Sequence, residues 1–217
     1  AESEIFNISQ KNIRSDFTNI KSVLSDSFDR IDELHKQKGS LSGLPTGYVE
    51  IDKLLGGMQR SDLLILAARP AMGKTSLALN IAQNVATQSN KPVGVFSLEM
   101  SKEQLVDRLL CAEANLDLRR LRTGLLSEDD FGKIGTAMGV LGEAEIYIDD
   151  TPGINVLEMR TKARRLQADA GVELIIIDYL QLMSGRNRSQ DNRVQEISEI
   201  SRALKGLARE LRVPVLA

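Results

Sequence analysis

The sequence has few of the residues that mark an extracellular or membrane-spanning protein. Its one cysteine, Cys111, cannot form an intrachain disulfide, and its one histidine, His35, has no cysteine or histidine partner at metal-ligand spacing. We expect Cys111 in the core and His35 on the surface. No stretch approaches the roughly 18 consecutive apolar residues of a membrane span. The acidic start at residues 1–4 has no apolar segment behind it, so we expect no signal peptide and a cytoplasmic protein.

Aromatic residues and net charge are also low. Tryptophan is absent and aromatic residues make up 4% of the chain, so a stacking platform for single-stranded nucleic acid is not expected. The formal net charge is −2, which is not the overall charge of a typical nucleic-acid-binding domain. Any DNA contact would need a local basic patch, or a pore that combines the charges of several subunits.

The sequence does contain a Gly-Lys-Thr ending between an apolar run and a helical pattern. The apolar run covers 63–67, and Leu77, Ile81 and Val85 follow at helical spacing. In a strand–loop–helix context, such a segment cradles phosphates with its backbone N–H groups and the positive end of the helix. The candidate nucleotide-binding residues of this loop are Ala68, Arg69, Pro70, Ala71, Met72, Gly73, Lys74, Thr75 and Ser76.

Three side chains would act on a nucleoside triphosphate and its Mg²⁺. Lys74 would reach the β- and γ-phosphates, and the Thr75 hydroxyl would coordinate the metal. Asp178 ends the apolar run 174–177, and a carboxylate at the carboxyl end of a buried parallel strand can hold Mg²⁺ through water. Ala68 replaces the first glycine of the motif, which is tolerated if its φ is that of an ordinary strand residue.

Glu99 is the candidate general base. Tyr179 follows Asp178, so no second carboxylate stands directly beside it, and hydrolysis needs such a group within reach of the attacking water. Glu99 directly follows the strand predicted at 93–98, which would place it at the same sheet edge as the phosphate loop. The alternative is an acid that merely stabilises a helix N-terminus, because Ser101 is a favourable N-cap.

From Leu44 onward, short apolar strands alternate with helices. The predicted strands are 63–67, 93–98, 145–149, 173–178 and 213–217. The predicted helices are 74–88, 102–114, 128–141, 155–170 and 193–211. This alternation indicates an α/β fold with a mostly parallel central sheet and helices on both faces. The last strand ends with nothing after it, and we expect that the core is cut short there.

Residues 1–40 have a different pattern. Apolar residues at three- and four-residue steps predict a helix of about 20 residues with one apolar stripe. They are Ile13, Phe17, Ile20, Leu24, Phe28, Ile31 and Leu34. Residues 36–43 then have the composition of a flexible linker. The stripe needs a cover, and the residues alone leave open whether its own domain or a neighbouring subunit supplies it.

Basic residues outnumber acidic ones by seven to four between positions 184 and 212. The segment 184–192 is polar and lacks periodicity, so we expect a mobile loop and a candidate nucleic-acid contact. A solvated helix face explains most of these charges equally well.

Five stretches together resemble the DnaB-type family of bacterial replicative DNA helicases, within the RecA-like ATPases. They are LPTGY (44–48, with ID at 51–52 and GG at 56–57), AARPAMGKT (67–75), FSLEM (96–100), IDDTPG (148–153) and IIIDYLQLM (175–183). The likeness extends from about residue 15 to the end of the chain. Alanine at position 68 is usual in that family. The ARP and DYLQ segments are much more specific than Gly-Lys-Thr alone.

The resemblance implies a RecA-like P-loop ATPase that forms a ring hexamer around one DNA strand and moves along it using ATP. Residues 1–40 would be a linker helix and connector, with the helix packed on the adjacent subunit, and 41–217 would be the ATPase core. ATP with Mg²⁺ would lie between subunits. Lys74, Thr75, Glu99 and Asp178 would stand on one side and an arginine finger of the next subunit on the other. Primase and a helicase loader are implied partners.

The sequence departs from the family at both ends. The family's N-terminal domain does not precede the helix, and the chain stops before the family's γ-phosphate-sensing glutamine, DNA-binding loop and arginine finger. We therefore expect a fragment that binds nucleotide but hydrolyses ATP and unwinds DNA poorly alone. The alternatives are a recombinase or circadian-clock-type ATPase of the same fold, and a nucleotide-binding assembly module that switches oligomeric state without translocating.

Overall fold

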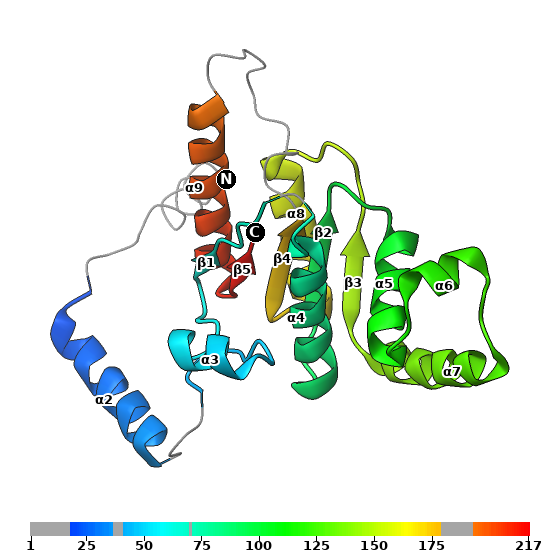
Figure 1. The fold of residues 1–217 in the computed structure, drawn as a ribbon. Coiled ribbons are helices and arrows are strands. Elements are labelled where there is room, and N and C mark those ends of the chain that lie inside the picture. Colours follow the sequence, from blue (N-terminus) through cyan, green and yellow to red (C-terminus); the bar gives the residue numbers. More distant parts are fainter. Residues whose placement is uncertain (1–17, 37–40, 70, 179–192) are drawn as a thin grey trace, which may run out of the picture. The chain divides into compact units, whose positions relative to one another are not determined.

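The computed structural model describes residues 18–36, 41–69, 71–178 and 193–217. Contacts divide the chain into two compact units, Ala1–Ser40 and Leu41–Ala217, and each is described by itself (Figure 1). No helix in the described ranges is long and apolar enough to cross a membrane.

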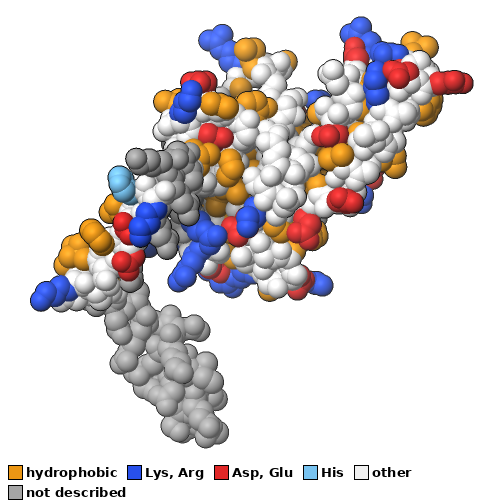
Figure 2. All heavy atoms as spheres, turned by 90° about the horizontal axis from the view of Figure 1, so that it is seen from below, with side chains coloured by type: hydrophobic (Ala, Val, Ile, Leu, Met, Phe, Trp, Pro, Cys, Tyr) orange, Lys and Arg blue, Asp and Glu red, His pale blue; other side chains and the backbone are white. Residues whose placement is uncertain are grey.

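The described part of the first unit is the helix α2 (Ile20–Lys36), which confirms a helix within the range predicted from the apolar stripe. Asn19 directly precedes the helix, and its Oδ1 accepts a hydrogen bond from the backbone N–H of Lys21 at 2.9 Å. Ile20, Leu24 and Phe28 are exposed, and hydrophobic side chains lie along the helix surface in Figure 2. Ile13 and Phe17 fall outside the described residues. His35 is exposed, as predicted.

The second unit is built on a five-stranded sheet in the order β1-β5-β4-β2-β3, with every strand pair parallel. The strands are β1 (Leu63–Leu64), β2 (Val93–Ser97), β3 (Ile146–Asp149), β4 (Leu174–Asp178) and β5 (Val215–Leu216). All five predicted strands are confirmed. β1 is shorter than predicted because the chain leaves the sheet for the phosphate loop, although the Leu66 N–H still donates to the Ala217 carbonyl at 2.8 Å.

The five helices predicted from the apolar pattern are also present, and two short helices were missed. The helices are α3 (Val49–Leu55), α4 (Lys74–Gln88), α5 (Lys102–Ala114), α6 (Leu118–Thr123), α7 (Glu128–Glu143), α8 (Val156–Ala170) and α9 (Arg193–Leu211). The missed ones are α3 and α6, which have seven and six residues and are too short to show a helical period.

The central strand β4 divides its side chains between two hydrophobic cores. Leu174 and Ile176 pack in a cluster that includes residues of α4 and α5, whereas Ile175 and Ile177 pack with α8 and α9. Burying each such side chain contributes about 1.5–3 kcal/mol. Helices therefore cover both faces of the sheet, as predicted, and a one-residue slip of β4 would exchange the two cores. This fixes the position of Asp178 at the end of the strand.

A buried polar cluster fastens the LPTGY segment to α4. The Thr46 N–H and hydroxyl both donate to Asp52 Oδ1 at 2.8 Å, and Asn84 on α4 donates to the Thr46 carbonyl at 3.1 Å. Gly47 has a φ of +81°, and a Cβ built there would lie 2.3 Å from Asn84 Nδ2. The segment therefore needs glycine at this position. Its contacts support the helix that follows the phosphate loop.

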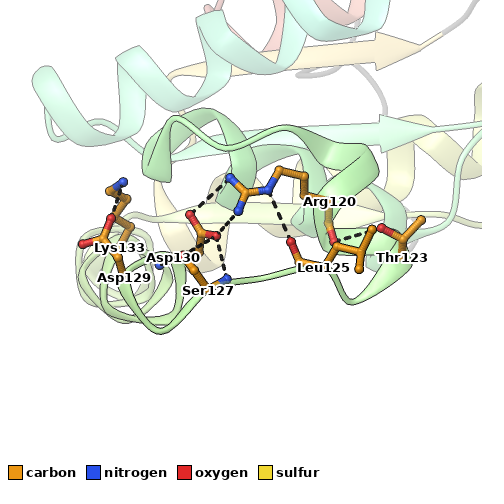
Figure 3. A network of polar contacts seen from close by, with 7 residues as sticks. All are labelled: Arg120, Thr123, Leu125, Ser127, Asp129, Asp130 and Lys133. Atoms are coloured by element: carbon orange, nitrogen blue, oxygen red, sulfur yellow. Dashed lines mark hydrogen bonds and ion pairs between the residues drawn. The ribbon is translucent and has the colours of Figure 1, made fainter.

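A second polar cluster joins α6 to α7 around the buried carboxylate of Asp130 (Figure 3). The Ser127 N–H and hydroxyl donate to its Oδ2 at 2.8 Å, and both terminal nitrogens of Arg120 contact the same carboxylate. The Asp130 N–H in turn donates to Ser127 Oγ, which completes a capping box at the start of α7. The hydrogen bonds from Ser127, assisted by the charge of Arg120, lower the pKa of Asp130 below its ordinary value of 3.8.

We expect Asp130→Asn to remove part of the acid sensitivity of this unit. A lowered pKa in the folded state gives stability that is present above about pH 3.8 and is lost as the pH falls through the folded-state pKa. The variant should be less stable than wild type near pH 7, and the difference should shrink on acidification. Urea unfolding midpoints between pH 3 and 7 measure this. Asp129→Asn is the control, because Asp129 is exposed and pairs with Lys133 on its own helix. Parallel pH curves for wild type and Asp130→Asn would contradict the assignment.

Candidate nucleotide-binding site

The loop between β1 and α4 has the backbone geometry of an anion-binding nest. Ala71 and Gly73 both adopt left-handed conformations, with φ of 63° and 85°. Left-handed residues within such a loop turn successive backbone N–H groups toward one concave side. Ala68 is not among the described residues with positive φ, so its Cβ is tolerated as predicted. Pro70 lies outside the described residues.

The first turn of α4 is open to an anion. Its N-cap is Gly73, which provides no capping side chain, and its first turn contains no acidic residue. The N–H groups at the start of a helix lack internal partners and carry the positive end of the helix dipole. By contrast, α5, α7 and α8 each have a capping side chain and at least one acid in the first turn. The start of α4 is therefore suited to an external anionic ligand.

Lys74, Thr75 and Asp178 meet at the carboxyl end of the sheet. Lys74 Nζ lies 2.8 Å from Asp178 Oδ1, and the Thr75 hydroxyl donates to Asp178 Oδ2 at 2.5 Å. The Asp178 side chain is 8% exposed. The adjacent hydroxyl and carboxylate oxygens are the hard donors that Mg²⁺ prefers, so this pair fits a magnesium ion. Lys74 and Asp178, which are far apart in the sequence, are thus in direct contact.

Glu99 is held at the same edge of the sheet by the buried Ser97. The Ser97 hydroxyl donates to the Met100 carbonyl at 2.7 Å and accepts from the Met100 N–H at 3.2 Å, which closes a tight turn around Glu99. The Leu98 N–H also donates to the Asp178 carbonyl at 2.7 Å. Ser101 caps α5 in a capping box with Gln104, so Glu99 itself lies outside the helix.

A cavity of about 620 Å³ joins these parts, within the range of about 300–1,000 Å³ common for small-molecule sites. The predicted residues that line it are Ala68, Arg69, Ala71, Gly73, Lys74, Thr75, Ser76 and Glu99. Met72 does not line it and is 73% exposed. Asp178 lies beside it in a smaller recess that it shares with Lys74.

Sequence reasoning missed Arg108, which also lines the cavity. Arg108 lies on α5 between the buried residues Leu105 and Leu109. Arginine is rarely buried unless it has a partner, so its position beside the apolar face of this helix is a signal that could have identified it. The segment 184–192, which was predicted as a candidate nucleic-acid contact, lies outside the described residues. Lys205 is engaged with Asp62 and with the Ser61 carbonyl, both at 2.9 Å.

A parallel sheet with a phosphate loop after β1 and a carboxylate at the tip of β4 defines a P-loop nucleotide-binding domain of the RecA-like class. Residues 43–217 match the model of the DnaB-like helicase C-terminal domain, and the chain belongs to this family. The resemblance inferred from the five sequence stretches is therefore confirmed. The recombinase-type and assembly-module alternatives gain no comparable support.

Two curated relatives and two solved structures illustrate the similarity. The chain is 56% identical over its full length to the replicative DNA helicase DnaC of Bacillus subtilis (strain 168), and 55% identical to the replicative DNA helicase DnaB of Geobacillus stearothermophilus. It spans 48% of each, about half of their length. One solved structure, of an ATPase domain, has a TM-score of 0.84 at 32% identity, covering 93% of this chain and 71% of that one. A DnaB-like replicative helicase, solved with its interactions with primase, has a TM-score of 0.80 at 32% identity and covers 100% and 52%.

Proposed function

We propose that this chain is the ATPase motor of a replicative DNA helicase, which hydrolyses ATP to translocate on single-stranded DNA and unwind the duplex at the replication fork. The observation that carries the proposal is the direct contact of Lys74 and Thr75 with Asp178 beside an open helix N-terminus. Family membership adds the helicase context to this ATPase chemistry.

The residues of the site divide the work of phosphoryl transfer. The backbone N–H groups of the phosphate loop and of the first turn of α4 hold the phosphates, and Lys74 neutralises negative charge on the β- and γ-phosphate oxygens. Thr75 and, through water, Asp178 would hold Mg²⁺, which when bound neutralises phosphate charge and orients the triphosphate. Glu99 accepts the proton of the water that attacks the γ-phosphorus. We infer that an arginine of the neighbouring subunit completes the site in trans, as the family resemblance implies.

The proposed assembly is a homo-hexamer. Residues 1–40 supply the linker helix and connector, and 41–217 supply the RecA-like core. The exposed hydrophobic side chains of α2 support a role in subunit contact, because an amphipathic helix needs a cover for its apolar face. Single-stranded DNA, primase and a helicase loader are the proposed partners, with the cytoplasm as the proposed location.

Titration of the chain with Mg·ATP by calorimetry tests the nucleotide site. We expect saturable binding that weakens when EDTA removes the magnesium. Lys74→Ala should weaken it about 10- to 100-fold, because a hydrogen bond to a charged group contributes about 1.5–3 kcal/mol. Arg165→Ala is the control, since Arg165 is 85% exposed and pairs with Asp169 on its own helix. Wild-type affinity in Lys74→Ala would refute the site.

The helicase function itself is tested on the full-length protein. ATP-dependent strand displacement on a forked duplex is expected, without strand exchange between homologous duplexes. Strand exchange in place of displacement would indicate a recombinase.

A further inference from the structure

The direction of the Glu99 carboxylate is set by the backbone that carries it. Among the described residues it takes part in no hydrogen bond or ion pair, although Glu99 lines the nucleotide cavity. Residues 98–101, here called the Glu99 turn, connect the end of β2 to the start of α5. A general base must lie within about 2.6–3.2 Å of the atom that gives up the proton. The position of the Glu99 turn therefore controls the distance from Glu99 to the attacking water.

Two neighbouring strands hold the two sides of the Glu99 turn. On the side of β2, the buried Ser97 hydroxyl forms two hydrogen bonds with the backbone of Met100. On the side of α5, the Lys102 N–H donates to Asp150 Oδ2 at 3.0 Å. Asp150 directly follows β3, which pairs with β2 in the sheet (Figure 1). The first N–H groups of a helix have no partner within the helix, so Asp150 supplies the acceptor for Lys102 from a different strand.

The other side-chain contacts at the start of α5 are longer. In the capping box, Ser101 Oγ accepts from the Gln104 N–H at 3.5 Å, and Gln104 Oε1 accepts from the Ser101 N–H at 3.3 Å. The most frequent distance for such bonds is about 2.9–3.0 Å. Both residues belong to α5 or to its cap, so the capping box stabilises the helix without fixing its first residue relative to the sheet. The bond to Asp150 does fix it.

We propose that Asp150 is a positioning residue for ATP hydrolysis, which holds the α5 side of the Glu99 turn through the Lys102 N–H. The inference rests on the proposed function, because it requires Glu99 to be the general base. Lys74 and Thr75, which would bind the phosphates and the metal, belong to α4 and have no bond to Asp150. Loss of Asp150 should therefore slow the chemical step and leave nucleotide binding unchanged.

The test compares Asp150→Ala, which removes the acceptor, with Asp150→Asn, which keeps a side-chain oxygen that can accept from the Lys102 N–H. Phosphate release by the assembled full-length protein measures kcat and KM, and calorimetry measures the Kd of Mg·ATP. A misplacement of about 1 Å can cost about 100-fold in rate, so we expect kcat to fall about 10- to 100-fold in Asp150→Ala. KM and Kd should stay at their wild-type values, and most of the rate should return in Asp150→Asn.

Asp117→Ala is the matched control. Asp117 Oδ1 accepts from the Arg119 N–H at 2.7 Å at the start of α6, so its loss also removes an acceptor from a helix start. Asp117 does not line the cavity, and this variant should keep the wild-type kcat.

A double-mutant cycle tests whether Asp150 acts through Glu99. If it does, Asp150→Ala should cost little further rate in a chain that already carries Glu99→Gln. Thermal unfolding verifies that each variant is folded. Asp150→Leu, which is close to aspartate in shape but has no acceptor, gives the same measurements if Asp150→Ala does not fold.

Four results would overturn the inference. A wild-type kcat in the folded variant without an acceptor would show that the contact is not needed. An equal loss in the wild-type and Glu99→Gln backgrounds would show that Asp150 acts independently of Glu99. A raised KM with unchanged kcat would assign Asp150 to binding, and no recovery in Asp150→Asn would assign the loss to the charge. Failure of the proposed function is distinguishable, because wild type would then not hydrolyse ATP or Glu99→Gln would turn over normally.

Discussion

Replacement of Glu99 by glutamine is expected to reduce ATP hydrolysis by about 10²- to 10⁴-fold while Mg·ATP binding persists. Glutamine has nearly the same shape as glutamate, so the turn closed by Ser97 and Met100 should be kept. It cannot accept the proton of the attacking water, because its side-chain amide is not a base at neutral pH. The change therefore removes the chemical step and leaves the phosphate contacts of Lys74 and Thr75 in place.

Phosphate release by the assembled full-length protein measures the chemical step, and calorimetry with Mg·ATP measures binding. Glu103→Gln is the matched control, because Glu103 lies nearby in the first turn of α5 but does not line the cavity. It should hydrolyse ATP at the wild-type rate. If Glu99→Gln also turns over normally, another group activates the water. An assembly module that only switches oligomeric state would likewise cycle normally in this variant.

The apolar pattern predicted the strands and long helices of the second unit well, because the period of a strand or a helix can be recognised within a short stretch of consecutive residues. The run at 174–177 identified β4 as a buried central strand, and its side chains do divide between two cores. The run cannot reveal which helix covers which face, since that depends on contacts between residues far apart in the sequence. The short helices α3 and α6 were missed because one or two turns do not establish a period.

For the candidate site, the sequence predicted the residues that belong to strand ends and loops. Lys74 and Asp178 are 104 positions apart, yet parallel strands bring their carboxyl ends to one edge, so their proximity could be inferred. Arg108 could not be placed in this way. It reaches the cavity from within a helix through a long side chain, and its direction depends on how α5 packs against α4. Met72 shows the converse limit, because it belongs to the motif but points outward.

Asp178→Asn is expected to affect binding and hydrolysis in opposite directions. The Asp178 carboxylate forms an ion pair with Lys74 and accepts a hydrogen bond from Thr75. Its negative charge would also repel a triphosphate that carries no metal. Two unit charges 4 Å apart interact by about 4 kcal/mol at an effective dielectric constant of 20. If the loss of the Asp178 charge removes about a third of this repulsion, metal-free ATP should bind roughly 10-fold more tightly. Hydrolysis should nevertheless fall by about 100-fold or more, because the variant holds Mg²⁺ poorly and the metal supplies several kcal/mol to the transition state.

Calorimetry with ATP in EDTA and in Mg²⁺ tests both parts of this prediction, together with phosphate release by the full-length protein. The variant should bind ATP more tightly than wild type in EDTA and gain little from added Mg²⁺. Asp149→Asn is the control, because Asp149 ends β3 at the same edge of the sheet but pairs with Lys162 at 2.7 Å. It should behave as wild type in both conditions. If Asp178→Asn weakens metal-free binding, then Asp178 does not compete with the phosphates for Lys74 but holds Lys74 in the position that receives them.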